Sequence, residues 1–483
     1  MIAETKDDVL IDAVNITSPE VHRAIDRKAK KYGLPHLQDF IGSVTRIDPN
    51  NDAFGRRYQF DTLARNGLKI ISPISGEIII SRRSVAVRGR IFYHFREAVE
   101  YYVVSSRIRL GYPLAAIFVP EANVLLRWEP GGRRGIQNTH LRTLIELVGK
   151  EPISLPSPAA IPVIVLGHRN FAHHLWNELS AIQSLVTRPL HSMPFEMMVT
   201  REPLGAIDKI FPELAGRTIT RLGAAAELSG NDPAKLFVNL GGYRISSGLR
   251  TRIASHAAAS ATADTNLLIK QLREHCSPVF WLSLRTQRPT FVNQADVLQS
   301  LAVELLDSFP SCGILLDGFS LPADWGATGS RNAGKYMAAA AATREDIEVA
   351  IQGILRERGG SPQRMIVNIG GIGILDSIAL AQLADAYFCH VGTVQHKIAW
   401  TTNRPGIIHG GRDMLAGNPA EWHASRLEDG YTPVQINAEL VEDLDPESRE
   451  PNYRAVDCPR LAEFVRDHFA HFLALRRETG SEQ

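Results

Sequence analysis

Candidate catalytic side chains gather in residues 163–179, where a β-branched run of strand type ends at a glycine and polar residues follow. His173, His174 and Glu178 lie close together there, at the start of a helical pattern. Imidazole and carboxylate groups are the side chains that most often transfer protons in enzymes. In an α/β sheet the strand ends open onto the ligand crevice, so this strand-to-helix corner is a candidate site. The alternative is a polar loop followed by a helix whose histidines are satisfied in the core.

Two arginines, Arg285 and Arg288, directly follow a second strand-like run, residues 279–284. Arginine binds phosphate through paired, charge-assisted hydrogen bonds, and the end of a strand would present both guanidinium groups to the crevice. These residues therefore predict a diphosphate site. The alternative is a pair of surface arginines with flexible head groups.

Glycines follow the strand-like residues 365–369, and Gly371 and Gly373 lead into a helical pattern. Backbone N–H groups and the helix dipole would meet an anion at such a turn. The spacing lacks the final glycine of the dinucleotide-binding fingerprint. A tight turn that needs a positive φ explains the glycines equally well.

Gly392 and Thr393 follow another strand-like run, and Lys397 lies one helical turn beyond them. A hydroxyl, free N–H groups and a cation within one turn would suit an oxygen-rich anion. The alternative is that Thr393 only caps the helix and that Lys397 is a solvated charge.

Alternating strand and helix patterns place these residues at the strand ends of two parallel sheets. The predicted strands are residues 162–168, 195–200, 217–220 and 235–240 in the first sheet, and 279–284, 313–317, 365–369, 386–390 and 406–409 in the second. An apolar stripe predicts a helix over 297–309, and a last helix follows Asp457 as its N-cap. The fold class is therefore α/β, with two Rossmann-like, doubly wound lobes and a cleft between them.

Short β-rich runs between residues 67 and 128 predict a small antiparallel unit ahead of the two lobes. Prolines and small residues at 151–160 indicate a linker after it. The predicted division is an accessory unit over 1–155, a first lobe over 156–270 and a second lobe over 271–483. A glycine-rich stretch, residues 321–335, is predicted to be a loop of the second lobe that acts as a lid; the alternative is a loop that is merely mobile.

Length and charge exclude several classes of protein. The 483 residues exceed the roughly 250–300 at which one core stops growing, so several domains are expected. Lysine and arginine number 53 against 52 acidic residues, so no overall field favours nucleic acid or an acidic membrane. The four cysteines form no CxxC pair, which argues against a zinc site. Without a signal-like start or an apolar run of about 18 residues, we expect a cytoplasmic protein, attached at most peripherally to the inner membrane.

Three segments resemble motifs of glycosyltransferase family 61, a group with the GT-B fold. Residues 170–177, Asn-Phe-Ala-His-His-Leu-Trp-Asn, are similar to that family's N-x-x-H…D helix start. Residues 283–288 are similar to its S-R-R segment, and residues 376–393 to the block that ends in H-G-A-G-L-T. The order and spacing agree over residues 163–411, and the N-terminal unit is outside the match. The chain departs from the family at Asn177, where the family has an aspartate, and at residues 390–395, which keep one glycine of G-x-H-G-A-G.

The resemblance implies an inverting, metal-independent glycosyltransferase without a cofactor. It would move a sugar from a nucleotide-sugar donor to a hydroxyl of a cell-surface polysaccharide or glycoconjugate. His173 matches the family histidine and is the first candidate for the general base on the acceptor side, ahead of His174 and Glu178. The residues expected to bind the donor on the second lobe are Arg285, Arg288, Gly371, Gly373, Gly392, Thr393 and Lys397.

Two alternatives stay open. One is another GT-B-shaped transferase, such as a fucosyl- or pyruvyl-transferring enzyme. The other is a catalytically degenerate scaffold that binds glycan, which Asn177 in place of an aspartate would explain.

Overall fold

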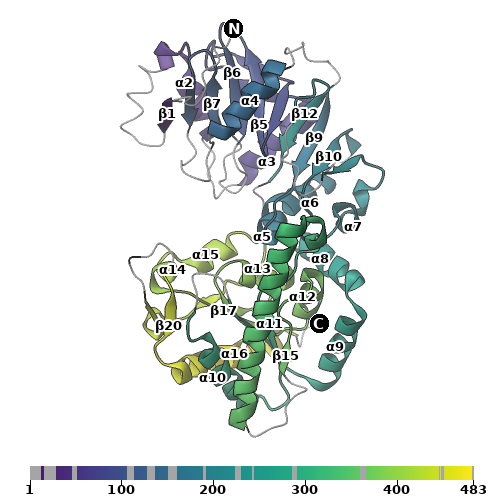
Figure 1. Cartoon of the computed structure of the whole chain (residues 1–483), viewed down its shortest axis with the longest axis vertical. Helices are drawn as coiled ribbons and strands as arrows, with labels where there is room; N and C mark the ends of the chain where they lie inside the picture. Colours follow the sequence, from purple (N-terminus) through teal and green to yellow (C-terminus); the bar gives the residue numbers. More distant parts are fainter. Residues whose placement is uncertain are drawn as a thin grey trace. The chain divides into compact units, whose positions relative to one another are not determined.

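The computed structural model describes residues 12–15, 29–45, 52–105, 114–127, 136, 138–150, 160–188, 192–222, 230–241, 244–285, 291–358, 366–444, 447 and 451–480. Contacts divide the chain into two compact units (Figure 1). The first comprises residues 1–169, 173–201 and 211–243, and the second comprises 170–172, 202–210 and 244–483. Within the described ranges, no helix is long and apolar enough to cross a membrane.

The first unit begins with a six-stranded sheet in the order β1-β8-β7-β6-β5-β4. Its strands are β1 (Asp12–Asn15), β4 (Ser84–Val87), β5 (Arg90–Arg96), β6 (Glu100–Ser105), β7 (Leu114–Val119) and β8 (Val124–Arg127). Neighbours from β4 to β8 pair antiparallel, which confirms the predicted antiparallel β-rich unit, while β1 pairs parallel to β8. Helix α4 (Asn138–Lys150) lies across this sheet and buries Leu141 and Leu144 against Phe92 and Phe118 (Figure 1).

Smaller elements complete the start of this unit. Strands β2 (Leu68–Ile71) and β3 (Ile78–Ser81) form an antiparallel hairpin beside helices α2 (Leu37–Thr45) and α3 (Asp52–Arg65). The hydroxyl of Ser84 in β4 accepts the backbone N–H of Phe237, so the N-terminal sheet is tied to the parallel sheet of the same unit.

The parallel sheet of the first unit has the order β11-β10-β9-β12. Its strands are β9 (Ile161–Leu166), β10 (Glu196–Val199), β11 (Ile219–Arg221) and β12 (Lys235–Asn239), all paired parallel. Strands β10 and β11 lie on one side of β9, and β12 lies on the other side, so the strand order reverses between β9 and β12. In open α/β sheets such a reversal is where ligands bind, beyond the carboxyl ends of the strands.

The second unit contains a six-stranded parallel sheet in the order β15-β14-β13-β16-β17-β18. Its strands are β13 (Val279–Ser283), β14 (Gly313–Asp317), β15 (Ile366–Asn368), β16 (Ala386–His390), β17 (Gly406–His409) and β18 (Val434–Gln435). Here the strand order reverses between β13 and β16. The remaining strands, β19 (Val441–Asp443) and β20 (Tyr453–Ala455), form an antiparallel pair.

Helices cover both faces of this second sheet because its strands are apolar on both sides. Phe280 and Leu282 pack with helices α10 (Gln294–Ser308), α11 (Ser330–Arg358) and α16 (Cys458–Gly480). Val279 and Trp281 pack with α9 (Ala263–His275), α12 (Ile374–Ala381) and α13 (Thr393–Thr402). The two doubly wound α/β sheets predicted from the sequence are thus confirmed.

The last helix, α16, starts where its capping signal predicts. The Asp457 carboxylate accepts the backbone N–H of Arg460 at 3.0 Å, as an N-cap does. Leu461, Val465 and Phe469 of this helix are buried in the core formed with α10.

Two predictions about the second unit differ from the structure. The expected lid-like loop is short, because α11 already begins at Ser330 and a 3₁₀ turn, Trp325–Ala327, precedes it. Leu321 is fixed by backbone hydrogen bonds with Ile372 and Ile374. Helix α8 (Ser247–Ser260) precedes the predicted boundary after residue 270 and α9 crosses it, and both helices pack on α12 within the second unit.

Candidate functional site

Glu178 closes the corner that follows β9 in the first unit. Its carboxylate accepts the backbone N–H of Gly167 at 2.9 Å and that of His168 at 3.1 Å. It also lies 2.6 Å from Nδ1 of His174. The strand end is therefore fastened to the helix that follows it.

A π-helical turn makes these contacts possible. The helix runs from α5 (Phe171–His173) through the π-helix η2 (His174–Leu179) into α6 (Ser180–Val186). The backbone N–H of Ser180 bonds to the carbonyl of Leu175, five residues back. The wider turn directs His174 and Glu178 inward, and such turns are frequent at functional sites.

The structure does not favour Glu178 or His174 as the general base. Burial raises the pKa of Glu178, but the His174 imidazole and the Gly167 N–H outweigh burial and hold that pKa below its ordinary value. His174 is fully buried and its Nδ1 is committed to Glu178. These two predicted base candidates therefore stabilise the turn between β9 and the helix that follows it.

His173 is the base candidate that stays partly accessible. Its ring is half-buried, with centroids 4.6 Å from the ring of His168 and 5.7 Å from that of Trp176. Its Nδ1 lies 3.2 Å from the side-chain amide of Asn177, which is buried. The side chain placed to orient the His173 imidazole is thus the amide of Asn177.

We expect Glu178→Gln to lower the free energy of unfolding by about 2 kcal/mol at pH 7, because an amide loses charge-assisted hydrogen bonds and brings an N–H to face donors. Since the folded pKa is lowered, the carboxylate stabilises the protein above its unfolded pKa near 4.5 and loses this effect as pH falls further. Urea unfolding at pH 7 and at pH 3.5 would measure both. The matched control is Glu146→Gln on an exposed position of α4. An equal change in both variants would contradict the anchoring role.

In the second unit, Arg285 lies at the reversal of strand order. It follows β13, and its guanidinium NH1 donates to Nδ1 of His390, the last residue of β16, at 2.9 Å. The carbonyl oxygen of Val391 is 3.5 Å from the same NH1. Arg285 therefore connects β13 and β16, the two strands between which the strand order reverses.

Gly392 and Thr393 complete this assembly at the start of α13. Gly392 has φ 115° and ψ −147°, a conformation that is almost restricted to glycine. A Cβ atom placed on it would lie 4.0 Å from NH1 of Arg285, so the turn and the guanidinium are neighbours. Thr393 is exposed, and its hydroxyl lies 3.4 Å from the amide nitrogen of Asn170 in the same unit. A guanidinium thus meets a helix N-terminus, which is an arrangement suited to phosphate.

His390, His409 and Tyr453 lie behind Arg285 and were not predicted as site residues. His390 and His409 are opposite residues on β16 and β17, with ring centroids 5.5 Å apart. Nδ1 of His409 lies 2.9 Å from the Tyr453 hydroxyl. Burial and then Arg285 lower the pKa of His409 to about 3, so both features keep this ring neutral.

Lys397 is not placed to bind a donor phosphate. Its Nζ donates to the Asp317 carboxylate at 2.6 Å, the Ser320 hydroxyl at 2.7 Å and the Gly318 carbonyl at 2.9 Å. These bonds use all three ammonium hydrogens in the core, and the side chain is 2% exposed. The predicted phosphate ligand is instead the internal anchor of α13.

We expect Lys397→Met to lower the free energy of unfolding by about 3 kcal/mol, because it leaves the Asp317 carboxylate buried without its cation. Burial already lowers the pKa of Lys397 and raises that of Asp317, so each charge depends on the other. The double variant Lys397→Met/Asp317→Val should recover most of the loss in a urea-unfolding double-mutant cycle. Strictly additive losses would contradict this coupling.

The glycines before α12 form a packed turn rather than a phosphate loop. Gly371 has φ +73°, and a Cβ there would crowd the carbonyl oxygen of Ala340. Its N–H donates to the carbonyl of Phe319, and the N–H of Ile374 is taken by Leu321. Gly373 is the N-cap of α12 and pairs with Leu321. A tight turn with a positive φ therefore describes Gly371, whereas Gly373 has φ −60° as the N-cap of α12.

Arg288 lies outside the described residues. Of the predicted donor-binding residues, the structure brings together Arg285, Gly392 and Thr393. Within the ranges that the structure describes, no cluster of three or more His, Cys, Asp or Glu side chains could hold a metal ion.

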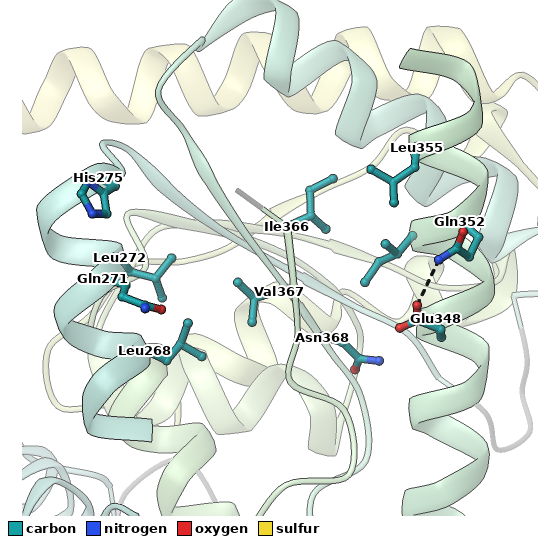
Figure 2. Close-up of a pocket in the computed structure, with 11 residues that line it drawn as sticks. Leu268, Gln271, Leu272, His275, Glu348, Gln352, Leu355, Ile366, Val367 and Asn368 are labelled. Atoms are coloured by element: carbon teal, nitrogen blue, oxygen red, sulfur yellow. Dashed lines mark hydrogen bonds between the residues drawn. The ribbon is translucent and has the colours of Figure 1, made fainter. Parts of the chain in front are cut away.

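A pocket of about 640 Å³ opens elsewhere in the second unit, beside the edge strand β15. Figure 2 shows Leu268 and Leu272 of α9 on one side, Ile366 and Val367 of β15 in the middle, and α11 on the other side. Its rim carries a hydrogen bond from Gln352 to Glu348. Among the described residues, its lining shares none with the predicted site and includes the acidic Glu348 but no lysine or arginine, which does not suit a phosphate.

Comparison with known proteins gives distant structural similarities only. No protein-family model and no curated protein matches the chain. The chain is similar to a putative UDP-N-acetylglucosamine 2-epimerase from Listeria monocytogenes at 11% identity and a TM-score of 0.31, over 54% of this chain and 82% of that one. It is similar to the E. coli heptosyltransferase WaaC with ADP at 10% identity and a TM-score of 0.28, over 58% of this chain and 94% of that one. It is similar to UDP-GlcNAc 2-epimerase from Methanocaldococcus jannaschii at 11% identity and a TM-score of 0.31, over 57% of this chain and 89% of that one.

Proposed function

We propose that this protein is a glycosyltransferase that uses a nucleotide-sugar donor. The observation that carries the proposal is the assembly of Arg285, Gly392 and Thr393 at the strand reversal of the second sheet. A leaving nucleoside diphosphate needs positive charge and N–H donors where its negative charge develops. A guanidinium beside a helix N-terminus supplies both.

His173 is the proposed general base. It follows the strand at which the first parallel sheet reverses, in the position where the family-61 pattern has its histidine. An imidazole that stays partly accessible is suited to remove a proton from an acceptor hydroxyl. Direct attack by that oxygen on the anomeric carbon, with departure of the diphosphate, would invert the configuration.

The finer assignments rest on the resemblance to family 61. They comprise a GT-B arrangement of the two lobes, a metal-independent reaction, an acceptor that is a cell-surface polysaccharide or glycoconjugate, and action in the cytoplasm. The guanidinium and helix N-terminus described above fit a mechanism in which side chains and a helix dipole replace a metal.

The test is a panel of UDP-, GDP- and ADP-sugars, assayed for binding by calorimetry and for hydrolysis or transfer by release of the nucleotide. We expect one nucleotide class to bind and to be turned over. Binding without turnover would favour the glycan-binding scaffold that Asn177 suggests. Absence of nucleotide binding would overturn the donor site.

A further inference from the structure

The hairpin β2–β3 of the first unit carries isoleucines on its outward face. In its antiparallel register Lys69 lies opposite Ile80, and Ile71 lies opposite Ile78. Successive side chains of a strand point to opposite faces, so these four side chains share one face of the hairpin. Ile78 is 61% exposed and Ile80 is 42% exposed. Two neighbouring aliphatic side chains on this face therefore reach the solvent.

The opposite face of the hairpin packs on the rest of the unit. Leu68, Ile70 and Ser81 are buried there, and β2 contacts helices α2 and α3. An antiparallel sheet with one face on a core usually carries polar side chains on its other face. A single exposed apolar residue is normal on a soluble protein, whereas a group on one face indicates an interaction surface. The outward isoleucines are therefore a candidate docking surface.

Two positive charges border the outward isoleucines. The exposed Lys69 lies opposite Ile80. A Cβ atom placed on Gly67 would lie 2.6 Å from Cγ2 of Ile80 and 3.2 Å from Cγ of the exposed Arg82, so these two side chains are neighbours. Within the described residues, which include all of 52–105, neither cationic group makes a hydrogen bond or an ion pair. The hairpin has one acidic side chain, Glu77, which precedes β3 and is out of phase with its exposed residues.

We propose that this outward face, which comprises Lys69, Ile71, Ile78, Ile80 and Arg82 and is called the isoleucine face below, binds an anionic lipid bilayer. The isoleucines enter the boundary between headgroups and acyl chains, and the two cations meet the lipid phosphates. The long aliphatic stems of the lysine and the arginine let their charges reach the headgroups while the isoleucines are buried. This inference goes beyond the proposed function and does not depend on it.

The size and charge of the isoleucine face favour a bilayer over a protein partner. Its five residues are far fewer than the roughly 20–30 residues a side of a stable protein interface. A second copy on the same face would bring Lys69 and Arg82 close to their own counterparts, and such like-charge contacts are unfavourable. A bilayer needs no matching side chains, and its anionic phosphates complement both cations.

The test is binding of the full chain to vesicles made from equal parts of phosphatidylglycerol and phosphatidylcholine, measured by flotation. We expect Ile78→Thr/Ile80→Thr to weaken this binding by about tenfold or more, because it removes apolar area that the bilayer buries. Threonine is β-branched like isoleucine, so the hairpin keeps its strand propensity. We expect Lys69→Gln/Arg82→Gln to weaken binding by about fivefold or more and to make it less dependent on salt.

Matched controls change the same kinds of exposed residue in the second unit. Leu267→Thr/Val349→Thr removes two apolar side chains, and Arg273→Gln/Lys335→Gln removes two positive charges. Both control proteins should bind the vesicles as the wild type does, and thermal unfolding verifies that every variant is folded. Vesicles of phosphatidylcholine alone should bind the wild type much more weakly.

Three results would overturn the proposal. One is a wild-type protein that does not bind the anionic vesicles, and another is unchanged binding in a folded Ile78→Thr/Ile80→Thr protein. The third is a wild-type dimer, seen by light scattering without lipid, that is lost in the same variant, because a second copy would then occupy the isoleucine face. Vesicle binding by a protein that binds no nucleotide would support this inference while the proposed function failed.

Discussion

Arg285→Ala should weaken the binding of the nucleotide by about a hundredfold or more, and turnover should fall at least as far. The guanidinium is the cation that the structure places beside the turn at Gly392. Its loss leaves the N-terminus of α13 as the only part of the described assembly that attracts the diphosphate. The helix dipole alone contributes much less than a charge-assisted bidentate pair. Calorimetry with the preferred nucleotide and release of that nucleotide from the sugar donor measure the two effects.

Two further variants make this prediction specific. Arg285→Lys keeps the charge but loses the planar fork, so binding should fall only in part and should depend more steeply on salt. Arg273→Ala removes an exposed arginine from α9 in the same unit and should leave binding unchanged. Wild-type affinity in Arg285→Ala would place the donor elsewhere.

Strand and helix patterns predicted the architecture well because both parallel sheets are buried on both faces. The run from Val279 to Leu282 is apolar throughout, as is typical of a strand covered by helices on both sides. Strand β1 of the N-terminal sheet lies outside the predicted β-rich stretch of residues 67–128 and was missed. The start of α11 was also missed, because the glycines and polar residues around Ser330 are typical of a loop.

The sequence predicted the site residues whose place follows from the end of their own strand. It did not predict the role of residues whose contacts depend on a partner far away in the chain. Arg285 and Gly392 meet because β13 and β16 are neighbours, and each follows its own strand. Lys397 was assigned to phosphate because nothing in its local sequence shows that Asp317, 80 residues away, pairs with it. His390 and His409 were not singled out, although both are the last residues of strands that pair in register, which is a usable signal.

His173→Ala should lower turnover by about a hundredfold to ten-thousandfold while nucleotide affinity stays within about twofold. A general base acts on the acceptor hydroxyl in the transition state, and the proposed donor site lies in the other unit. Pre-steady-state transfer and calorimetry separate these two effects. His168→Ala, at the neighbouring ring, is the matched control for loss of the aromatic contact and should reduce turnover much less.

Loss of nucleotide affinity in His173→Ala would contradict its assignment to the acceptor side. Equal loss of turnover in the His168 and His173 variants would indicate that the ring pair supports the fold of the corner and that neither ring is the base.

Asn177→Asp should raise turnover and move the acid limb of the pH–rate profile to higher pH. In the native chain the amide of Asn177 lies 3.2 Å from Nδ1 of His173, and its oxygen is buried without a hydrogen-bond partner. A carboxylate there would accept an Nδ1–H, leave the lone pair on Nε2 and stabilise the imidazolium that forms on proton transfer. Since Asn177 is 2% exposed, the new charge has little water to weaken this effect. An Asn177→Asp protein that folds, binds nucleotide and shows an unchanged pH–rate profile would mean that His173 does not take the proton.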